Sequence, residues 1–341
     1  MSNLYIRHKQ PEYSDPISFS LGQMLPEAHK QPEWIIKGLL RQGEQLMVYA
    51  APGNYKSWFT TALGMAAAGG TALLQDNGGN EWLSPKKHKV LVVDGEMAGY
   101  ELAGRYAALF PHYGGTDLEV LPRCHQKHKT QFINLSDTRD IDALYDKVIA
   151  DKVELLILDN LSTVAQLDDE NSATSFYNLL EGLLMFKNAG VAVVVVHHAN
   201  KTGGSYRGST MLATTFNKIL KLEKVSGEKG RIKVSFDKFR ESGVDDSILL
   251  DLKEFAGGSL RFERNSEDRK YQYLVELLKT YKYAKDVDLI PEMSIYLDCS
   301  VTRQRLADMK RRCFAMGLIS PEEWASIQSG AKVSQHSLIE D

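Results

Sequence analysis

The sequence has few cysteines and no long hydrophobic run. Only three cysteines, Cys124, Cys299 and Cys313, occur in 341 residues. Their odd number and wide spacing argue against a disulfide framework and fit a reducing cytoplasm. The longest apolar run, Val191 to Val196, is far too short to span a bilayer, and the polar start MSNLYIRHKQPEYSD lacks the apolar core of a signal peptide. We therefore expect a cytoplasmic protein without a membrane partner.

An excess of positive charge is also missing, because the net charge is -3. This excludes a protein that binds nucleic acid through bulk positive charge, so any such contact must come from local loops or a channel. Internal repeats and low-complexity segments are absent as well. The hydrophobic fraction of 43% and the charged fraction of 25% are typical of globular proteins. The length fits one large domain and a smaller one.

Residues 45–60, QLMVYAAPGNYKSWFT, predict a strand, a tight loop and the start of a helix that reaches about Ala68. A phosphate-binding loop needs this setting: backbone N–H groups surround a polyphosphate, a lysine reaches its outer phosphates and a hydroxyl holds Mg²⁺. Two positions depart from the pattern GxxxxGK[ST], since Ala50 and Tyr55 replace its glycines. The alternative is a strand–turn–helix with an incidental Lys-Ser pair. The predicted nucleotide-binding residues are Pro52, Gly53, Asn54, Tyr55, Lys56, Ser57 and Trp58.

Carboxylates follow two further apolar segments. KVLVVD ends at Asp94 and is followed by Glu96, and LLIL is followed by Asp159. Ligands of parallel sheets bind at the carboxyl ends of the strands. Glu96 is the candidate base for the attacking water, with a solvated turn glutamate as the alternative, and Asp94 either supports the site or caps the turn. Asp159 is predicted to hold Mg²⁺ together with Ser57.

The most apolar segment, Val191 to Val196, leads into HHANK and a glycine-rich loop. A histidine at a strand end beside a nucleotide, here His198, can bind the γ-phosphate and transmit its loss to the adjoining loop. That loop carries Lys201, Tyr206 and Arg207, which combine phosphate neutralisation with base stacking, as single-strand binding requires. A solvated loop is the alternative.

Continuous Val, Leu and Ile segments between helices predict an α/β domain with a mostly parallel sheet. Short strands are also expected at 118–121 and 132–135, and residues 69–87 are expected to form an insertion. Cys124, His125 and His128 between those two strands could ligate a metal, although a basic surface loop fits better. From residue 217 onward, strand-like segments at 219–225, 231–236, 247–252 and 259–263 predict an antiparallel extension.

Lys238 and Arg240 follow the second segment of this extension. They lie on one face if the strand continues, and they could reach the phosphates of ATP bound by a neighbouring subunit.

The domain boundaries are set by changes in composition. Residues 1–33 contain Pro11, Pro16, Pro26 and Pro32 and predict an extended arm, and 34–264 form the α/β domain. Helical segments and a basic face in 265–326 predict a small winged-helix or helix-turn-helix domain. Whether that face binds DNA or only solvates a helix stays open at this point. Residues 327–341 form a polar tail.

Five stretches of the sequence together resemble the RecA-like ATPases of the RepA type. They are residues 34–57, 90–97 and 155–159 and the motifs HHANK and YRGST. These are hexameric replicative helicases of plasmids, with relatives in phages and mobile elements. The resemblance covers about 34–264 and implies a catalytic role for Glu96, a Mg²⁺-associated role for Asp159 and a γ-phosphate sensor in His198. Lys238-Phe239-Arg240 looks like the Lys-x-Arg pair of DnaB-type helicases, whose arginine acts on the neighbouring subunit.

The leading hypothesis is therefore an ATP- and Mg²⁺-dependent ring helicase that acts on single-stranded DNA and contacts replication proteins through its C-terminal domain. Lys56, His198, Lys238 and Arg240 would act with Glu96 in catalysis. Two alternatives remain: a nucleic-acid-binding regulator or loader with little ATP turnover, and a RecA-like filament-forming recombination ATPase.

Overall fold

The structure is a computed structural model. It describes residues 18–26, 30–76, 79–125, 132–165, 176–200, 203–208, 210–239, 247–280, 286–297 and 299–315, and the single positions Ile319, Glu323 and Ala325. The chain divides into two units, 1–33 and 34–341. In the first unit, helix α1 (Leu21–Met24) begins with a capping box, in which Ser20 Oγ accepts a hydrogen bond from Gln23 N at 3.3 Å.

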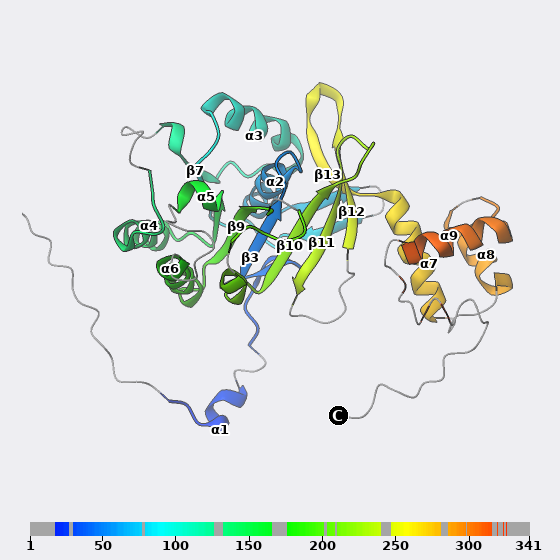
Figure 1. Ribbon diagram of the computed structural model, residues 1–341, viewed down its shortest axis with the longest axis horizontal. Helices are drawn as coiled ribbons and strands as arrows, with labels where there is room; N and C mark the ends of the chain where they lie inside the picture. The colour runs from blue at the N-terminus through cyan, green and yellow to red at the C-terminus, as the bar shows by residue number, and fades with distance from the viewer. Residues whose placement is uncertain are drawn as a thin grey trace, which may run out of the picture. The chain divides into compact units, whose positions relative to one another are not determined.

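An eleven-stranded sheet dominates the described part of the second unit (Figure 1). Its strand order is β5-β4-β13-β12-β11-β10-β3-β9-β8-β6-β7. The strands are β3 (Gln45–Ala50), β4 (Ala72–Asp76), β5 (Gly79–Leu83), β6 (Val90–Asp94), β7 (Glu119–Pro122), β8 (Leu155–Asp159), β9 (Ala192–His198), β10 (Lys218–Lys224), β11 (Arg231–Phe239), β12 (Ser247–Glu254) and β13 (Leu260–Arg264). A separate pair is formed by β1 (Trp34–Ile36) and β2 (Leu40–Arg41).

The sheet confirms the predicted fold class. The sheet has a parallel part, in which neighbouring strands of the series β10, β3, β9, β8, β6 and β7 run in the same direction. On the other side of β10 the sheet is antiparallel, through the pairs β10–β11, β11–β12 and β12–β13. The carboxyl ends of β3, β9, β8 and β6 therefore meet at one edge of the parallel part. This is where parallel sheets bind ligands.

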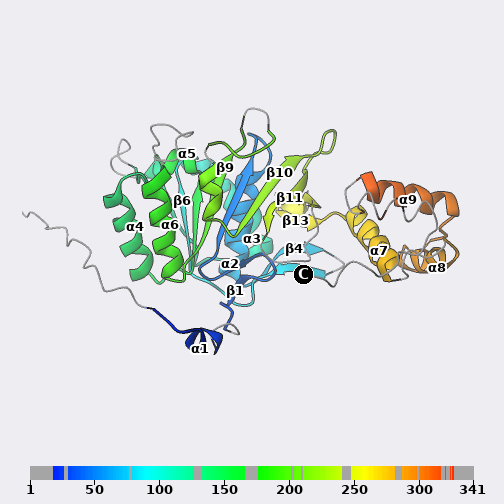
Figure 2. The ribbon, with the colours of Figure 1, turned by 60° about the horizontal axis from the view of Figure 1, so that its bottom comes forward.

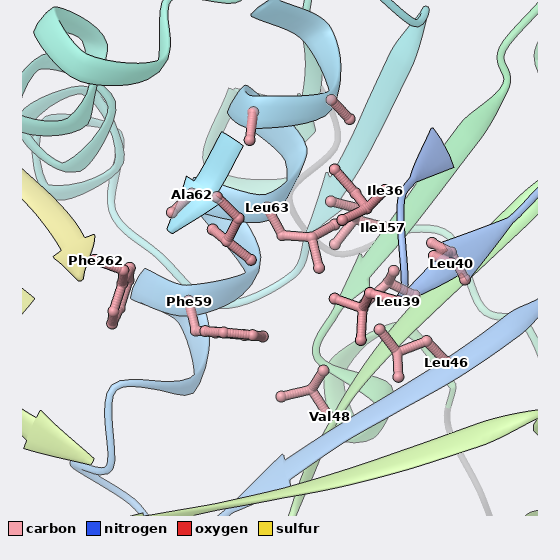
Figure 3. Close-up of a cluster of buried hydrophobic side chains, with 14 of the residues drawn as sticks. Ile36, Leu39, Leu40, Leu46, Val48, Phe59, Ala62, Leu63, Ile157 and Phe262 are labelled. Carbon is pink, nitrogen blue, oxygen red and sulfur yellow. The ribbon is translucent and has the colours of Figure 1, made fainter. Parts of the chain in front are cut away.

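Helices cover both faces of the sheet and define two buried clusters. The first cluster includes side chains of α2 (Lys56–Gly69) and α3 (Gly99–Tyr113), and the second includes those of α4 (Thr138–Ala150), α5 (Leu161–Val164) and α6 (Tyr177–Asn188). Figure 2 shows α4 and α6 side by side on their face of the sheet. In Figure 3, the ring of Phe59 on α2 points toward Val48 of β3, within the first cluster. Because strand side chains alternate, neighbouring residues of β3 serve different clusters: Val48 belongs to the first and Tyr49 to the second.

Two predictions of local structure are wrong. Residues 132–135 form no strand, because Phe132 and Leu135 anchor the loop to the second cluster while Leu135 N donates to Val164 O at 2.7 Å. The stretch 69–87 contains the hairpin β4–β5 rather than a simple insertion, and β4 pairs with β13 in parallel. Pairing with a strand so distant in the sequence is not visible in the local pattern.

The C-terminal segment contains α7 (Ser266–Thr280), α8 (Asp286–Tyr296) and α9 (Arg303–Ala315). These helices share a third buried cluster that includes Leu274, Met293 and Leu306. The described residues after 264 include no strand, so the wing of the predicted winged-helix domain is not found among them. Within the described residues, no helix has the combined length and apolarity needed to cross a membrane.

Candidate functional site

The predicted phosphate-binding loop joins β3 to α2. Gly53 has φ 81, and Tyr55, the N-cap residue of α2, provides no side-chain hydrogen bond to the first turn. The first N–H groups of a helix have no intrahelical partner, so an uncapped N-terminus favours an anion. Lys56 is the first residue of α2 and is buried, with 8% of its surface exposed. The loop therefore has the local features of a phosphate site.

Tyr55 stands in the left-handed region, with φ 60 and ψ 14. Glycine enters this region without a steric cost, whereas a tyrosine does so rarely. Its ring is partly buried against the first cluster. The departure from the glycine pattern thus preserves the backbone path of the loop and adds a packing contact.

Two buried carboxylates lie side by side on neighbouring strands beside this loop. Asp94 and Asp159 end neighbouring strands in direct register, and they are 3% and 5% exposed. Burial, followed by the charge of Asp94, raises the pKa of Asp159 to about 6, while a hydrogen bond from Ser57 opposes this shift. Burial also raises the pKa of Asp94. The structure thus joins Ser57 to Asp159, the two residues predicted to hold a metal.

Asp94 caps the turn that carries Glu96. The Asp94 Oδ1 atom accepts hydrogen bonds from Glu96 N at 3.1 Å and from Met97 N at 2.8 Å. Glu96 itself is exposed, and its carboxylate accepts a hydrogen bond from the side-chain amide of Asn160. The candidate base is therefore tied to the residue that follows Asp159, with its carboxylate open to solvent.

The donor set fits Mg²⁺. Asp159 Oδ1 is buried and has no hydrogen-bond partner within the described residues, and the Ser57 hydroxyl lies beside the same carboxylate. Mg²⁺ is bound through one or two protein oxygens together with substrate phosphates and water. Ser57 and Asp159 would hold the ion here, and Asp94 lies beside Asp159 on the neighbouring strand.

Arg105 was not predicted from the sequence. It lies on α3, its guanidinium carbon is 5.0 Å from the ring centre of Trp58, and its charge acts on Asp94 and Asp159. Burial lowers its pKa. Helical spacing from the buried Leu102 to Leu109 places Arg105 near the covered face of α3, and this periodicity is the signal that could have identified it.

The two histidines at the end of β9 face opposite sides of the sheet, as strand alternation requires. His197 is buried, and its Nε2 atom lies 2.7 Å from the carbonyl oxygen of Arg207, which requires this nitrogen to donate. Burial lowers the pKa of His197 to about 4, so its ring is neutral near pH 7. His198, the predicted γ-phosphate sensor, is half-buried on the opposite face.

The segment after β9 folds back along the strand end. Arg207 N donates to His198 O at 2.9 Å, Asn200 N donates to Ser205 O at 2.8 Å, and Ala199 bridges Tyr206. The Tyr206 ring packs edge-on against Tyr49, and Arg207 is exposed. We call residues 203–208 the β9 return loop; Lys201, predicted to bind nucleic acid, lies outside the described residues.

Of the predicted cationic pair, Lys238 lies on β11, where its Nζ atom donates to Ala213 O at 2.7 Å. Arg240 lies outside the described residues. A cavity of about 160 Å³ opens between the phosphate loop and β10, with Asn54, Gly203 and Lys221 among its lining residues. Asn54 Nδ2 also donates to Leu222 O at 3.3 Å, which ties the loop to β10.

Of the proposed metal-ligating set near residue 124, Cys124 and His125 are described and His128 lies outside the described residues. Within the part of the chain that the structure describes, no group of three or more His, Cys, Asp or Glu side chains could hold a metal ion. All three cysteines are free.

The comparison with protein families decides the assignment. The profile of AAA_25, described as an AAA domain, matches residues 12–204, which contain the phosphate loop, Glu96, Asp159 and the two histidines. The chain belongs to this AAA domain family. Family and sheet together give it the α/β fold of the RecA-like P-loop ATPases, whose members bind ATP, usually with Mg²⁺. The match ends before β10, so the antiparallel strands and the C-terminal helices lie outside it.

Two solved structures are similar to this AAA domain protein. The flagellar accessory protein FlaH from Methanocaldococcus jannaschii is 10% identical, with a TM-score of 0.46 over 67% of this chain and 92% of FlaH. The RadB recombinase is 15% identical, with a TM-score of 0.44 over 66% of this chain and 92% of RadB. A search of curated proteins gave no match to the sequence.

Proposed function

We propose that this chain is an ATP-dependent motor on single-stranded DNA, namely a ring-forming replicative helicase of a phage, plasmid or mobile element. ATP is hydrolysed between subunits, and the three-helix segment contacts DNA or replication proteins. Each site combines two sets of residues. One protomer supplies Lys56, Ser57, Glu96, Asp159 and His198, and the next supplies Lys238 and Arg240.

The observation that carries the proposal is the hydrogen-bonded link between β9 and its return loop. The backbone of Arg207 is bonded to both histidines: its N–H to His198 O and its carbonyl oxygen to His197 Nε2. A shift of the β9 end on loss of the γ-phosphate would therefore move the exposed cation of Arg207. This arrangement supports ATP turnover that depends on nucleic acid.

The proposed reaction is transfer of the γ-phosphoryl group to water. The water oxygen bonds to the γ-phosphorus as the bond to the ADP oxygen breaks, and Glu96 accepts the proton of the water. The Asn160 amide orients that carboxylate through its hydrogen bond. Mg²⁺, when bound, neutralises charge on the phosphates, and Lys56 supplies a further cation from the start of α2.

The first test is steady-state ATP hydrolysis with and without single-stranded DNA. We expect DNA to stimulate the wild type, and Glu96→Gln to lower kcat by roughly 10²-fold or more while ATP still binds. Glu101→Gln, a change of an exposed glutamate on α3, is the matched control and should be silent. A Glu96→Gln variant that hydrolyses ATP at the wild-type rate would refute the role of Glu96.

Sharing of the site between subunits needs its own test. Arg240→Ala should lower kcat by about 10³-fold, whereas Lys229→Ala, in the exposed turn before β11, should not. Mixed oligomers of Glu96→Gln and Arg240→Ala protomers should regain activity, because some interfaces then carry both intact residues. Mixtures as inactive as the parents would argue against a shared site.

Tyr55 and the basic residues of α9 favour one alternative, a nucleotide-gated DNA-binding protein. This alternative predicts that ATP binds but that turnover stays at background with and without DNA. A recombination ATPase would instead form open filaments on single-stranded DNA and would not unwind a forked duplex. Electron microscopy and a strand-displacement assay separate these outcomes from a closed, unwinding ring.

A further inference from the structure

Tyr49 is a fully buried tyrosine at the nucleotide end of the sheet. It is the last residue but one of β3, directly before the phosphate loop, and is 0% exposed. Its side chain belongs to the second cluster, on the face opposite α2. It therefore lies behind the nucleotide site rather than in it.

The hydroxyl of Tyr49 reaches across β10 to β11, where it donates a hydrogen bond to the Asp237 carboxylate. Asp237 sits in a β-bulge, because Ile219 pairs with Lys238 while Leu220 already pairs with Phe236. An extra residue of this kind changes the face of the sheet from which the following side chains project. Here the bulge directly precedes Lys238, whose Nζ atom contacts Ala213 beside the second cluster.

The ring of Tyr49 contacts the β9 return loop. Its centre is 5.8 Å from that of Tyr206, and the two planes meet at 81°. Tyr206 directly precedes Arg207, whose backbone is bonded to both histidines of β9. The Tyr49 side chain thus contacts both β11, at the residue directly before Lys238, and the β9 return loop.

The protonation state of Tyr49 favours a persistent hydrogen bond to Asp237. Burial and the neighbouring Asp237 carboxylate raise the pKa of Tyr49, so its hydroxyl remains protonated and continues to donate. The bond is partly buried and joins Tyr49 to a charged carboxylate, and hydrogen bonds to charged groups are stronger than those between neutral groups.

We propose that Tyr49 is a positioning residue that couples the β9 return loop to the Asp237 bulge of β11, so that both move together when nucleic acid stimulates ATP hydrolysis. The inference rests on the proposed function, because it assumes that the return loop contacts nucleic acid and that the Lys238 segment serves a neighbouring site. Without the Tyr49 hydroxyl, the loop and the bulge would respond separately.

Tyr113 provides a control for a purely structural tyrosine. It is also fully buried, and its hydroxyl donates to Leu73 O at 2.8 Å and accepts from Phe262 N at 2.8 Å. These partners belong to β4 and β13, at the far part of the sheet. Tyr113→Phe therefore removes a buried hydroxyl without touching the proposed coupling.

The experiment measures kcat and KM for ATP with and without single-stranded DNA. We expect Tyr49→Phe to keep the unstimulated kcat and KM within about two-fold and to lower the stimulation ratio about five-fold or more, the lower range of allosteric coupling. Tyr113→Phe should keep the ratio even if it lowers the melting temperature. Asp237→Asn, which retains an acceptor oxygen, should keep most of the ratio, whereas Asp237→Ala should lose it.

The double variant Tyr49→Phe/Asp237→Ala tests whether the two groups act as a pair. If they do, it should be no worse than either single variant. Asp237→Ala also tests the coupling should Tyr49→Phe fail to fold.

Other outcomes overturn the inference in distinguishable ways. If DNA stimulates the wild type and Tyr49→Phe equally, the coupling role fails and the proposed function stands. If DNA does not stimulate the wild type, the proposed function fails and the coupling role fails with it.

Discussion

Replacing Tyr55 tests the most unusual feature of the phosphate loop, its left-handed tyrosine with φ 60 and ψ 14. The left-handed conformation costs an L-residue with a Cβ about 1–2 kcal/mol, and Tyr55→Gly removes that cost. Glycine in turn loses about 0.5–1 kcal/mol more backbone entropy on folding. The change also removes a ring that is partly buried, for which we take about 1 kcal/mol, below the value for full burial. These effects nearly cancel, so we expect Tyr55→Gly to change the free energy of unfolding by less than about 1 kcal/mol.

Tyr55→Ala separates the two contributions, because it removes the same ring but keeps a Cβ in the left-handed region. Tyr55→Ala should therefore be less stable than Tyr55→Gly by about 1 kcal/mol, which corresponds to roughly 2–4 °C in Tm for a domain of this size. Urea denaturation with matched m-values, together with thermal melting, measures this difference. Tyr55→Phe keeps the ring and serves as the control, with stability close to the wild type.

The relative stability of Tyr55→Ala and Tyr55→Gly decides whether residue 55 is held in the left-handed region. If Tyr55→Ala were as stable as Tyr55→Gly, or more stable, the loop would not hold residue 55 in the left-handed region. Tyr55 would then not replace the second glycine of the phosphate-loop pattern by adopting a left-handed backbone.

Three further predictions concern packing, a thiol and pH. Gly69→Ala would place a Cβ 1.9 Å from the carbonyl oxygen of Tyr113 and should destabilise by about 3 kcal/mol, whereas Gly104→Ala, exposed on α3 with nothing within 4 Å, should stabilise by about 0.5–1 kcal/mol in urea titrations. Cys313 is buried and its pKa is raised to about 12, so thiol reagents should modify exposed Cys299 in the native protein and Cys313 only after denaturant is added. Burial lowers the pKa of His197 to about 4. Below about pH 6.5, His197 therefore binds a proton in the unfolded chain but stays neutral in the folded chain. Its contribution to stability is therefore lost as pH falls from about 6.5 towards 4, and wild-type urea midpoints should drop more steeply over this range than those of His197→Gln. Equal slopes would show that His197 is not buried in its neutral form.

The strands and the acidic residues of the site could be predicted from the sequence because their signals are local. Continuous apolar runs gave β6, β8 and β9, and the residue that ends each run identified Asp94, Asp159 and His198 as edge residues. Parallel strands expose their carboxyl ends together, so three separate segments were correctly expected to meet beside one loop. The turn role of Asp94 was one of two alternatives, and its hydrogen bonds to the amides of Glu96 and Met97 establish it.

Features that depend on contacts between distant segments could not be predicted in this way. The β4–β5 hairpin owes its place to pairing with β13, and the bulge at Asp237 depends on its register with β10. From the sequence alone, Asp237 is an exposed residue beside a strand, and only the register with β10 shows that it is the unpaired residue of a bulge. Such information lies in the pairing of strands, not in the composition of either one.

The same limit explains why the sequence separates groups that the fold joins. In the sequence, Tyr49 is one more apolar residue of the strand before the phosphate loop. Tyr206 is predicted to be a stacking residue in a glycine-rich loop. In the structure they touch, and the Tyr49 hydroxyl continues to Asp237. A ring that packs against Tyr49 has less surface for a base, so Tyr206 is placed better to report on the state of the sheet than to hold a base alone. Arg207, exposed and bonded through its backbone to both histidines, is then the residue of the return loop from which we expect the stronger contact with nucleic acid.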